Sequence, residues 1–286
     1  MLNMTSYILR ITALTSALLM TSPIFTTATW ADDAAKRTVH ALGEADRLIA
    51  RDSTSLYPDA ITALPDVGYI RRLSPEGVLS VDPDLILTLD GAGPPEAVTV
   101  LKSAGVKFVS LPESYDAAGV VGKIDGVGKA LGVSTKASAL SEKVAASFKK
   151  LDAQTRGLPQ RKRVMFILSL SGGKILASGT DTAADGIIQL AGAENAITEF
   201  TGYKALSEEA IITSAPDVIL MMDRGGNHSA DARDLFSHPA ISQTPAAQGR
   251  ALVKMNGLYL LGFGPRTADA ATDLFETLYT AAPATD

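Results

Sequence analysis

Cysteine is absent from this chain of 286 residues, which also holds only three histidines and one tryptophan. Without cysteine the protein has no disulfide, no thiolate metal site, no thiol nucleophile and no lipid-modified N-terminal cysteine. The Lys and Arg residues form no basic run longer than three residues, and the formal net charge is −5, so we expect no nucleic-acid partner. The G-x-S-x-G, Walker A and H-E-x-x-H motifs are missing too, which does not favour an enzyme.

The N-terminal segment has the layout of a secretory signal. Residues 1–31 contain a single charged side chain, Arg10, followed by an apolar stretch over residues 11–24. Small residues then lead to Ala31, and two aspartates follow it. We therefore predict a signal peptide over residues 1–31 and export to the periplasm. The apolar stretch is shorter than the roughly 20 residues that span a membrane, and a retained N-terminal anchor is the alternative.

Two segments of the chain resemble each other at an offset of about half its length. Residues 76–87 read EGVLSVDPDLIL and residues 209–220 read EAIITSAPDVIL, each two residues after a serine, Ser74 or Ser207. A serine at this place is a good helix N-cap, and the proline within each segment ends a short helix. The repeat therefore predicts two similar lobes.

The apolar runs that close these repeats indicate buried strands. Residues 85–89 (LILTL) and 218–222 (VILMM) have no polar alternation, which is typical of strands buried on both faces of a parallel sheet. Each lobe should therefore be a three-layer α/β unit. Further strands are expected at residues 107–111, 163–169, 251–255 and 258–261, and helices at residues 96–104 and 265–279.

A single long helix is expected between the lobes. Leu140, Val144, Phe148 and Leu151 recur at helical spacing, and nothing breaks the helix before Gly157. We place the N-terminal lobe at residues 32–133, the connecting helix at 134–157 and the C-terminal lobe at 158–286. A core helix of one continuous domain is the alternative.

Few residues offer site chemistry. His228 and His238 lie close to acidic residues and could bind zinc, although a solvated polar loop explains the same pattern. Ser171 to Lys174 (SGGK) is expected to be a turn between strands. The loop at residues 51–58 (RDSTSLYP) ends in Tyr57 and Pro58, and the proline favours an extended backbone for the tyrosine. From the spacing alone, Tyr57 is either a ligand-binding residue or a packed tyrosine at a rim.

The chain resembles the class III solute-binding proteins, and within that class the periplasmic haem-binding proteins of bacterial haem ABC importers. The RDSTSLYP loop is the most specific element of this resemblance, which covers most of the chain from Ala41 to Tyr279. The other matching motifs are LPDVGY at 64–69, LSPEG at 73–77, DTAAD at 181–185 and GFGPRT at 262–267. The resemblance implies two Rossmann-like lobes joined by one long helix. It also shows a departure, because about ten residues are missing near residues 36–43, so the first strand should be absent or much shortened.

The resemblance implies a site for ferric haem between the lobes. Tyr57 would be the axial ligand of the iron, and tyrosinate is a known haem ligand type. An arginine would support the phenolate, either Arg224 or, as the second candidate, Arg266. Relatives that hold a second haem use a histidine near residues 168–173, where this chain has none, so we expect one haem. Leu56, Tyr69, Tyr203 and Phe263 are expected to flank the porphyrin.

The resemblance also implies the partners. Glu76 and Glu209, one on each lobe, would dock onto the dimeric permease of an ABC importer with its ATPase, and an outer-membrane haem receptor system would act upstream. Each glutamate could instead only complement the positive end of its helix, worth ~0.3–1 kcal/mol. We expect a monomer. The rival functions are a ferric-siderophore or cobalamin receptor, a zinc-binding receptor and a periplasmic enzyme.

Overall fold

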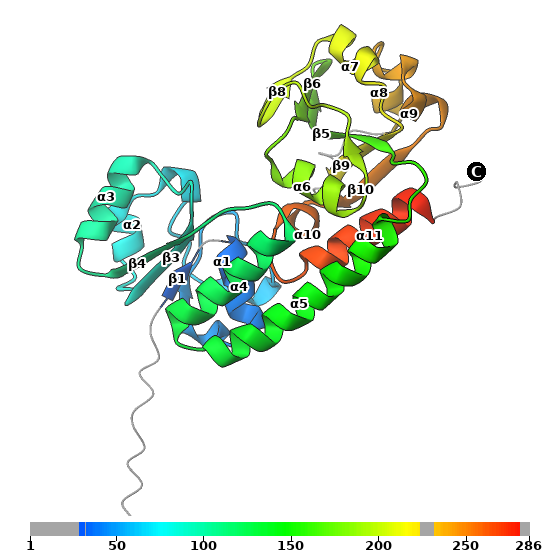
Figure 1. Cartoon of the computed structure of the whole chain (residues 1–286). Helices are drawn as coiled ribbons and strands as arrows, with labels where there is room; N and C mark the ends of the chain where they lie inside the picture. Colours follow the sequence, from blue (N-terminus) through cyan, green and yellow to red (C-terminus); the bar gives the residue numbers. More distant parts are fainter. Residues whose placement is uncertain (1–28, 32, 224–231, 281–286) are drawn as a thin grey trace, which may run out of the picture.

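Two α/β lobes joined by a long helix make up the protein, as the repeat predicts (Figure 1). The structure, a computed structural model, describes residues 29–31, 33–223 and 232–280. The joining helix is α5 (Ser134–Thr155), which is continuous over its whole length. Val144, Phe148 and Leu151 are buried on the face of α5 that the spacing predicts. No helix within the described ranges is both long and apolar enough to span a membrane.

The N-terminal lobe is built on a parallel sheet with strand order β2-β1-β3-β4. Its strands are β1 (Thr29–Ala31), β2 (Leu48–Ala50), β3 (Leu85–Leu89) and β4 (Lys107–Leu111). Its helices are α1 (Asp33–Ala41), α2 (Pro75–Leu79), α3 (Pro95–Ser103) and α4 (Ala117–Leu131). Every residue of β3 is buried: Leu85 and Leu87 pack in one core cluster and Ile86 in another. The apolar run therefore lies between two helical layers, as predicted.

Strand β1 decides between the two alternatives for the first strand, because the strand is much shortened, to three residues, but not absent. It is short, but it lies inside the sheet, paired with β2 on one side and β3 on the other. Its three residues fall within the segment 1–31 that the sequence predicts as a signal peptide. The position of cleavage stays a prediction. The sheet keeps β1, however, only if the mature chain begins at or before Thr29.

We expect a protein that begins at Thr29 to be more stable than one that begins at Asp32. Removal of β1 leaves backbone groups of both β2 and β3 without their partners, and each lost hydrogen bond costs about 1 kcal/mol or more. The shorter protein should lose at least about 3 kcal/mol, measured by urea unfolding. Mass spectrometry of the exported protein should find an N-terminus at or before Thr29; a start at Asp32 with full stability would contradict the role of β1.

The C-terminal lobe contains a mixed sheet with strand order β10-β9-β5-β6-β8, and β7 also pairs with β5. Its strands are β5 (Arg163–Ser171), β6 (Lys174–Ser178), β7 (Glu194–Asn195), β8 (Tyr203–Ala205), β9 (Val218–Asp223) and β10 (Leu252–Asn256). Its helices are α6 (Ala183–Leu190), α7 (Glu208–Ser214), α8 (Ala232–Phe236), α9 (Pro245–Gln248), α10 (Gly257–Leu261) and α11 (Thr267–Tyr279).

One edge of this sheet is antiparallel, whereas the predicted strand at residues 218–222 lies in its parallel part. Strands β5 and β6 form an antiparallel hairpin, and β8 pairs antiparallel with β6. The hairpin turns at Gly172 and Gly173, both with positive φ, a conformation that glycine adopts without a steric penalty. The predicted turn at SGGK is therefore correct, but it reverses the chain within the same sheet.

The repeated helices begin where the sequence predicts. The Ser74 hydroxyl accepts a hydrogen bond from Gly77 N at the start of α2, and the Ser207 hydroxyl accepts one from Ala210 N at the start of α7. Both caps satisfy a backbone donor that the first helical turn leaves free.

The strand predicted at residues 258–261 is wrong, because these residues form helix α10. The Asn256 side chain accepts a hydrogen bond from Tyr259 N at 3.0 Å and starts a helical turn there. Helix α10 contacts α6 and α11, and α11 runs beside α5 (Figure 1). One core cluster extends through both lobes and includes residues of α4, α5, α6 and α11.

Candidate functional site

Tyr57 lies in the loop at residues 51–58 that leaves strand β2. Its side chain is 38% exposed, and within the described part of the chain its hydroxyl has no hydrogen-bond partner. The neighbouring Leu56 is half exposed as well. The loop thus presents an apolar and a phenolic side chain outward. The contacts that hold the loop in place are polar and buried.

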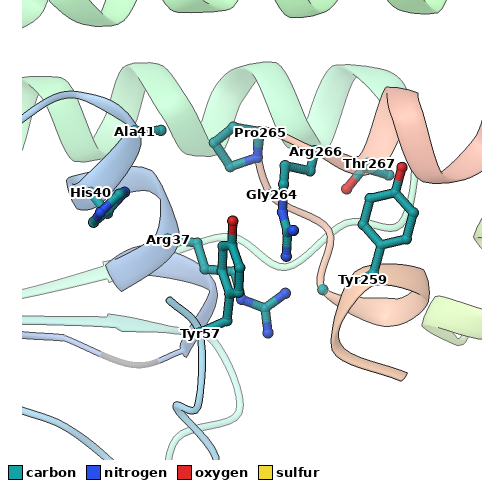
Figure 2. Close-up of a pocket in the computed structure, with 10 residues that line it drawn as sticks. Arg37, His40, Ala41, Tyr57, Tyr259, Gly264, Pro265, Arg266 and Thr267 are labelled. Carbon is teal, nitrogen blue, oxygen red and sulfur yellow. The ribbon is translucent and has the colours of Figure 1, made fainter. Parts of the chain in front are cut away.

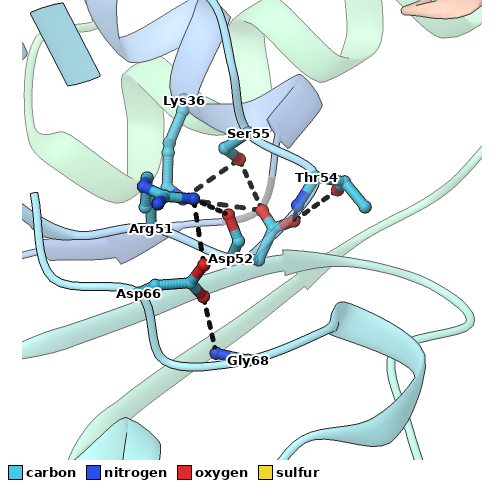
Figure 3. A network of polar contacts seen from close by, with 7 residues as sticks. All are labelled: Lys36, Arg51, Asp52, Thr54, Ser55, Asp66 and Gly68. Atoms are coloured by element: carbon cyan, nitrogen blue, oxygen red, sulfur yellow. Dashed lines mark hydrogen bonds and ion pairs between the residues drawn. The ribbon is translucent and has the colours of Figure 1, made fainter. Parts of the chain in front are cut away.

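A buried ion pair anchors this loop to helix α1 (Figure 3). Lys36 Nζ lies 3.5 Å from Asp52 Oδ2 and donates a hydrogen bond to Ser55 Oγ at 3.1 Å, and the side chains of Lys36 and Asp52 are fully buried. Ser55 Oγ in turn donates to Asp52 Oδ2 at 2.5 Å, and Thr54 donates to Asp52 Oδ1 through its backbone N at 2.8 Å and its hydroxyl.

The charge state of Asp52 follows from these partners. Burial alone raises the pKa of this carboxyl, but the Lys36 ammonium and the hydrogen bonds from Ser55 and Thr54 outweigh it and hold the pKa of Asp52 below its ordinary value. Asp52 is therefore a carboxylate at neutral pH. A charged, fully hydrogen-bonded carboxylate fixes the backbone of residues 52–55, two residues before Tyr57.

A second anchor holds the start of the loop. Arg51 Nη1 lies 3.1 Å from Asp66 Oδ2, and Asp66 Oδ1 accepts a hydrogen bond from Gly68 N at 2.9 Å (Figure 3). The backbones of Arg51 and Val67 are also hydrogen-bonded. The RDSTS part of the motif is thus structural: its charged residues build the loop that presents Tyr57.

Arg266 lies directly against the Tyr57 ring (Figure 2). Its guanidinium carbon is 3.7 Å from the centroid of that ring and 5.2 Å from the centroid of the Tyr259 ring. A cation at this distance over an aromatic face is attracted by the ring electrons. The guanidinium covers a face of the ring, so it leaves the phenolic oxygen open.

Tyr57 and Arg266 line a pocket of about 220 Å³ together with Arg37, His40 and Tyr259 (Figure 2). A neighbouring pocket of about 550 Å³ is lined by Leu56 and by residues of β9 and α10, and the two pockets share Arg37 and Gly262. Both open at the boundary between the lobes. A mostly apolar space with a few polar anchors suits a bound small molecule.

The second tyrosine beside Arg266 differs from Tyr57 in its hydroxyl. Tyr259 OH donates a hydrogen bond to Asp273 Oδ2 at 2.9 Å. Burial, and then this hydrogen bond and the charge of Asp273, raise the pKa of the Tyr259 phenol. Tyr259 therefore stays a neutral phenol at any physiological pH, and its oxygen is already engaged.

Of the two arginines predicted to support Tyr57, only one lies within the described residues. Arg266, predicted as the second candidate, is brought onto Tyr57. Arg224, predicted as the first, lies outside the described residues, as does His228. Sequence reasoning did not single out Lys36 or Arg37. The available signal was a pair of adjacent cations in a stretch rich in alanine.

His238 does not have the surroundings of a zinc ligand. The residue is buried, its Nε2 lies 3.0 Å from Gly173 O, and its Nδ1 accepts a hydrogen bond from Ala240 N at 3.2 Å. Among the described residues, no three His, Asp or Glu side chains converge as metal ligands do. His238 thus serves to join the β5–β6 turn to the segment after α8.

The side chains expected to flank a porphyrin fall into two groups. Leu56, Tyr69 and Tyr203 are among the large apolar or aromatic side chains that remain exposed. Phe263 is buried and packs edge to face on Tyr115, with the ring centroids 5.2 Å apart. The expectation for Phe263 is therefore wrong, since its ring belongs to the core between the lobes.

Glu76 and Glu209 both lie exposed in the first turn of their helices, α2 and α7. These helices lie in different lobes (Figure 1). Their side chains are thus available to a partner, and both also lie where a helix favours a negative charge.

Comparison with known proteins shows which proteins are similar to this chain. The chain is similar to the structure of the periplasmic heme-binding protein BhuT in complex with two hemes, with 39% identity, a TM-score of 0.83, and coverage of 87% of this chain and 96% of that one. It is also similar to the periplasmic heme-binding protein RhuT from Roseiflexus sp. RS-1 in apo form, with 32% identity, a TM-score of 0.82, and coverage of 88% and 98%. Among curated proteins it matches an uncharacterized ABC transporter substrate-binding lipoprotein, YvrC of Bacillus subtilis, with 24% identity over 84% of this chain and 76% of that one.

The family comparison covers most of the chain. The periplasmic binding protein model matches residues 32–257, which include both sheets except for β1, and the connecting helix α5. The match and the two-lobed fold agree with the class III architecture that the sequence predicts. This chain belongs to the periplasmic binding protein family.

Proposed function

We propose that this protein captures ferric haem in the periplasm and delivers it to the permease of an ABC importer. The observation that carries the proposal is the outward Tyr57 with Arg266 stacked on its ring. Two similar structures, at 39% and 32% identity, are of heme-binding proteins. These relatives and the family are binding proteins rather than enzymes. In the proposal the protein is exported through its signal segment and acts as a monomer.

Tyr57 is proposed as the axial ligand of the haem iron. A free phenol has a pKa near ~10, so ferric iron must displace its proton at neutral pH. The resulting phenolate is negative, and the Arg266 guanidinium, which stays charged at any physiological pH, lies against the same ring. Because it stacks on the face of the ring, it offsets the phenolate charge without occupying the oxygen that iron needs.

The chain is proposed to bind one haem. The BhuT structure holds two hemes, but here residues 168–173 contain no histidine that could hold a second iron. The exposed Leu56 next to Tyr57 and the pocket it lines offer apolar surface for a single porphyrin.

A ligand comparison separates haem from the other cargoes of this class. A ligand that binds the folded state stabilises it by RT ln(1 + [L]/Kd), so at one ligand concentration a tighter ligand raises the unfolding temperature more. We expect hemin to raise the unfolding temperature of the purified protein by several degrees, and cobalamin, a ferric siderophore and zinc to leave it unchanged. A shift with cobalamin or a siderophore and none with hemin would assign the site to that ligand instead.

Glu76 and Glu209 are proposed to dock onto the two subunits of the permease, because a two-fold partner can engage one residue on each lobe. Reversing both charges (Glu76→Lys with Glu209→Lys) should reduce permease-dependent haem uptake roughly 10–100-fold and leave hemin affinity unchanged. Glu96→Lys is the matched control, since Glu96 is also exposed in the first turn of a helix, α3. Equal uptake by the double variant and the control would leave these glutamates with only their effect on the helix ends.

A further inference from the structure

The turn that carries Arg266 is held by two buried cations. Arg37 donates a hydrogen bond through Nη1 to the carbonyl oxygen of Leu258, in α10. Lys123 donates through Nζ to the carbonyl oxygen of Phe263 at 2.9 Å. The segment at residues 258–266 is therefore held at two backbone oxygens, which lie eight and three residues before Arg266. We refer to these two hydrogen bonds as the carbonyl clamp.

Both donors of the carbonyl clamp come from the N-terminal lobe, and both are buried. Arg37 is on α1 and Lys123 is on α4, whereas the turn they hold follows β10 of the C-terminal lobe. The Lys123 side chain is fully buried and also pairs with Glu113 at 2.7 Å. Removing a lysine from water costs several kcal/mol. The ion pair with Glu113 and the hydrogen bond to Phe263 O offset that cost.

The backbone of the turn is shaped to admit the Arg37 guanidinium. A Cβ built on Gly262 would overlap Arg37 Nη1 and would also lie only 2.6 Å from Leu258 O, which accepts the Arg37 hydrogen bond. Gly262 has an ordinary right-handed helical backbone, with φ −78° and ψ −11°. Glycine is thus required here by the close approach of Arg37 and of the Leu258 oxygen, and not by the values of φ and ψ.

Helix α1 reaches both halves of the ligand site with two consecutive residues. Lys36 holds the loop that carries Tyr57, and Arg37 holds the turn that carries Arg266. The side chains of consecutive helical residues point about 100° apart, so one short helix can form hydrogen bonds with two separate segments. The 3.7 Å contact of Tyr57 with Arg266 lies between the two segments so held.

We infer that Arg37 and Lys123 are positioning residues of the ligand site, which keep Arg266 stacked on Tyr57 by holding the turn at residues 258–266. This inference rests on the proposed function only in its first test, which uses hemin as the ligand. Loss of the carbonyl clamp lets Arg266 leave the ring, and a phenolate at Tyr57 then loses the cation that lies against its ring.

The first test follows the pH at which the ferric tyrosinate absorption of bound hemin is lost on acidification. Arg266→Met should raise that midpoint by roughly 0.5–1 pH unit. Lys123→Met should raise it in the same direction, and should add nothing in the Arg266→Met background, because both changes remove one contact. An unchanged midpoint, or the same added shift in both backgrounds, would overturn the inference.

Gly262→Ala keeps every charge and crowds both partners of one hydrogen bond of the carbonyl clamp, the Arg37 guanidinium and the Leu258 oxygen. It therefore tests the clamp independently if Lys123→Met does not fold. Gly249→Ala is its matched control: Gly249 also ends a short helix with φ −83° and ψ −1°, and its added Cβ would meet nothing closer than 3.7 Å. We expect the midpoint to rise in Gly262→Ala and to stay unchanged in Gly249→Ala. A rise in both, or in neither, would contradict the role of Arg37.

The second test needs no ligand. Because the chain has no cysteine, spin labels can be placed at Thr99→Cys on α3 and Asp269→Cys on α11, both exposed positions. Pulsed EPR should give a narrow distance distribution that broadens with Lys123→Met or Gly262→Ala, while the pair Thr99→Cys and Lys129→Cys within the N-terminal lobe stays narrow. An unchanged Thr99–Asp269 distribution would overturn the clamp. If the wild type shows no tyrosinate absorption with hemin, the proposed function fails. The second test still shows whether the carbonyl clamp holds the segment.

Discussion

Replacing Tyr57 with phenylalanine should remove the ferric tyrosinate absorption of bound hemin and weaken hemin affinity about 10²–10³-fold. The variant loses one oxygen atom, which is the proposed ligand of the iron. The apolar surface beside it, including Leu56, is retained, so weak binding of the porphyrin should persist. Absorption spectra and a hemin titration measure the two effects separately.

Tyr69→Phe is the control for this change. Tyr69 is exposed to a similar degree as Tyr57, at 41% against 38%, and it is not proposed to touch the iron. Its variant should keep both the tyrosinate spectrum and the affinity to within a few-fold. A spectrum that survives in Tyr57→Phe and is lost in Tyr69→Phe would move the ligand to the other tyrosine.

Replacing Lys36 with methionine should destabilise the protein by about 3–5 kcal/mol, because it leaves the buried Asp52 carboxylate without its cation. Lys150→Met, at an exposed position of α5, should change stability by no more than ~0.5 kcal/mol. Urea unfolding at neutral pH compares the two variants. A loss below about 1 kcal/mol for Lys36→Met would mean that the ion pair does not hold the loop.

The same ion pair predicts how stability depends on pH. The folded-state pKa of Asp52 is lowered, so its contribution is fully present above the ordinary carboxyl value near ~3.9. It is lost as the pH falls through the lower, folded-state value. Without Lys36, the ammonium that opposes the effect of burial is lost and only the hydrogen bonds from Ser55 and Thr54 still lower the pKa of Asp52. The pKa therefore rises relative to the wild type, and acid unfolding of Lys36→Met should begin at a higher pH.

The sequence predicted the parts of the fold that are governed by long apolar patterns. The runs at residues 85–89 and 218–222 became buried strands, and the spacing from Leu140 to Leu151 became one face of α5. The serine caps at Ser74 and Ser207 were also foreseen, because their hydrogen bonds are made within three residues. These features depend on local chemistry or on burial alone.

The failures involve short elements that depend on distant partners. Strand β1 has three residues and is defined by its pairing with β2 and β3, and no pattern of three residues separates a strand from the end of a signal segment. Residues 258–261 are apolar enough for a strand, but the Asn256 cap makes them a helix. The ring contact of Arg266 with Tyr57 joins positions 209 residues apart, and the sequence could nominate both residues but not their geometry.

Absorption titration of the purified protein with hemin is the measurement that tests the central claim most directly. The account predicts a ferric tyrosinate spectrum that grows to an end point of one hemin per chain and stops there. A spectrum without tyrosinate ligation, or no saturable binding at all, would contradict haem capture by Tyr57.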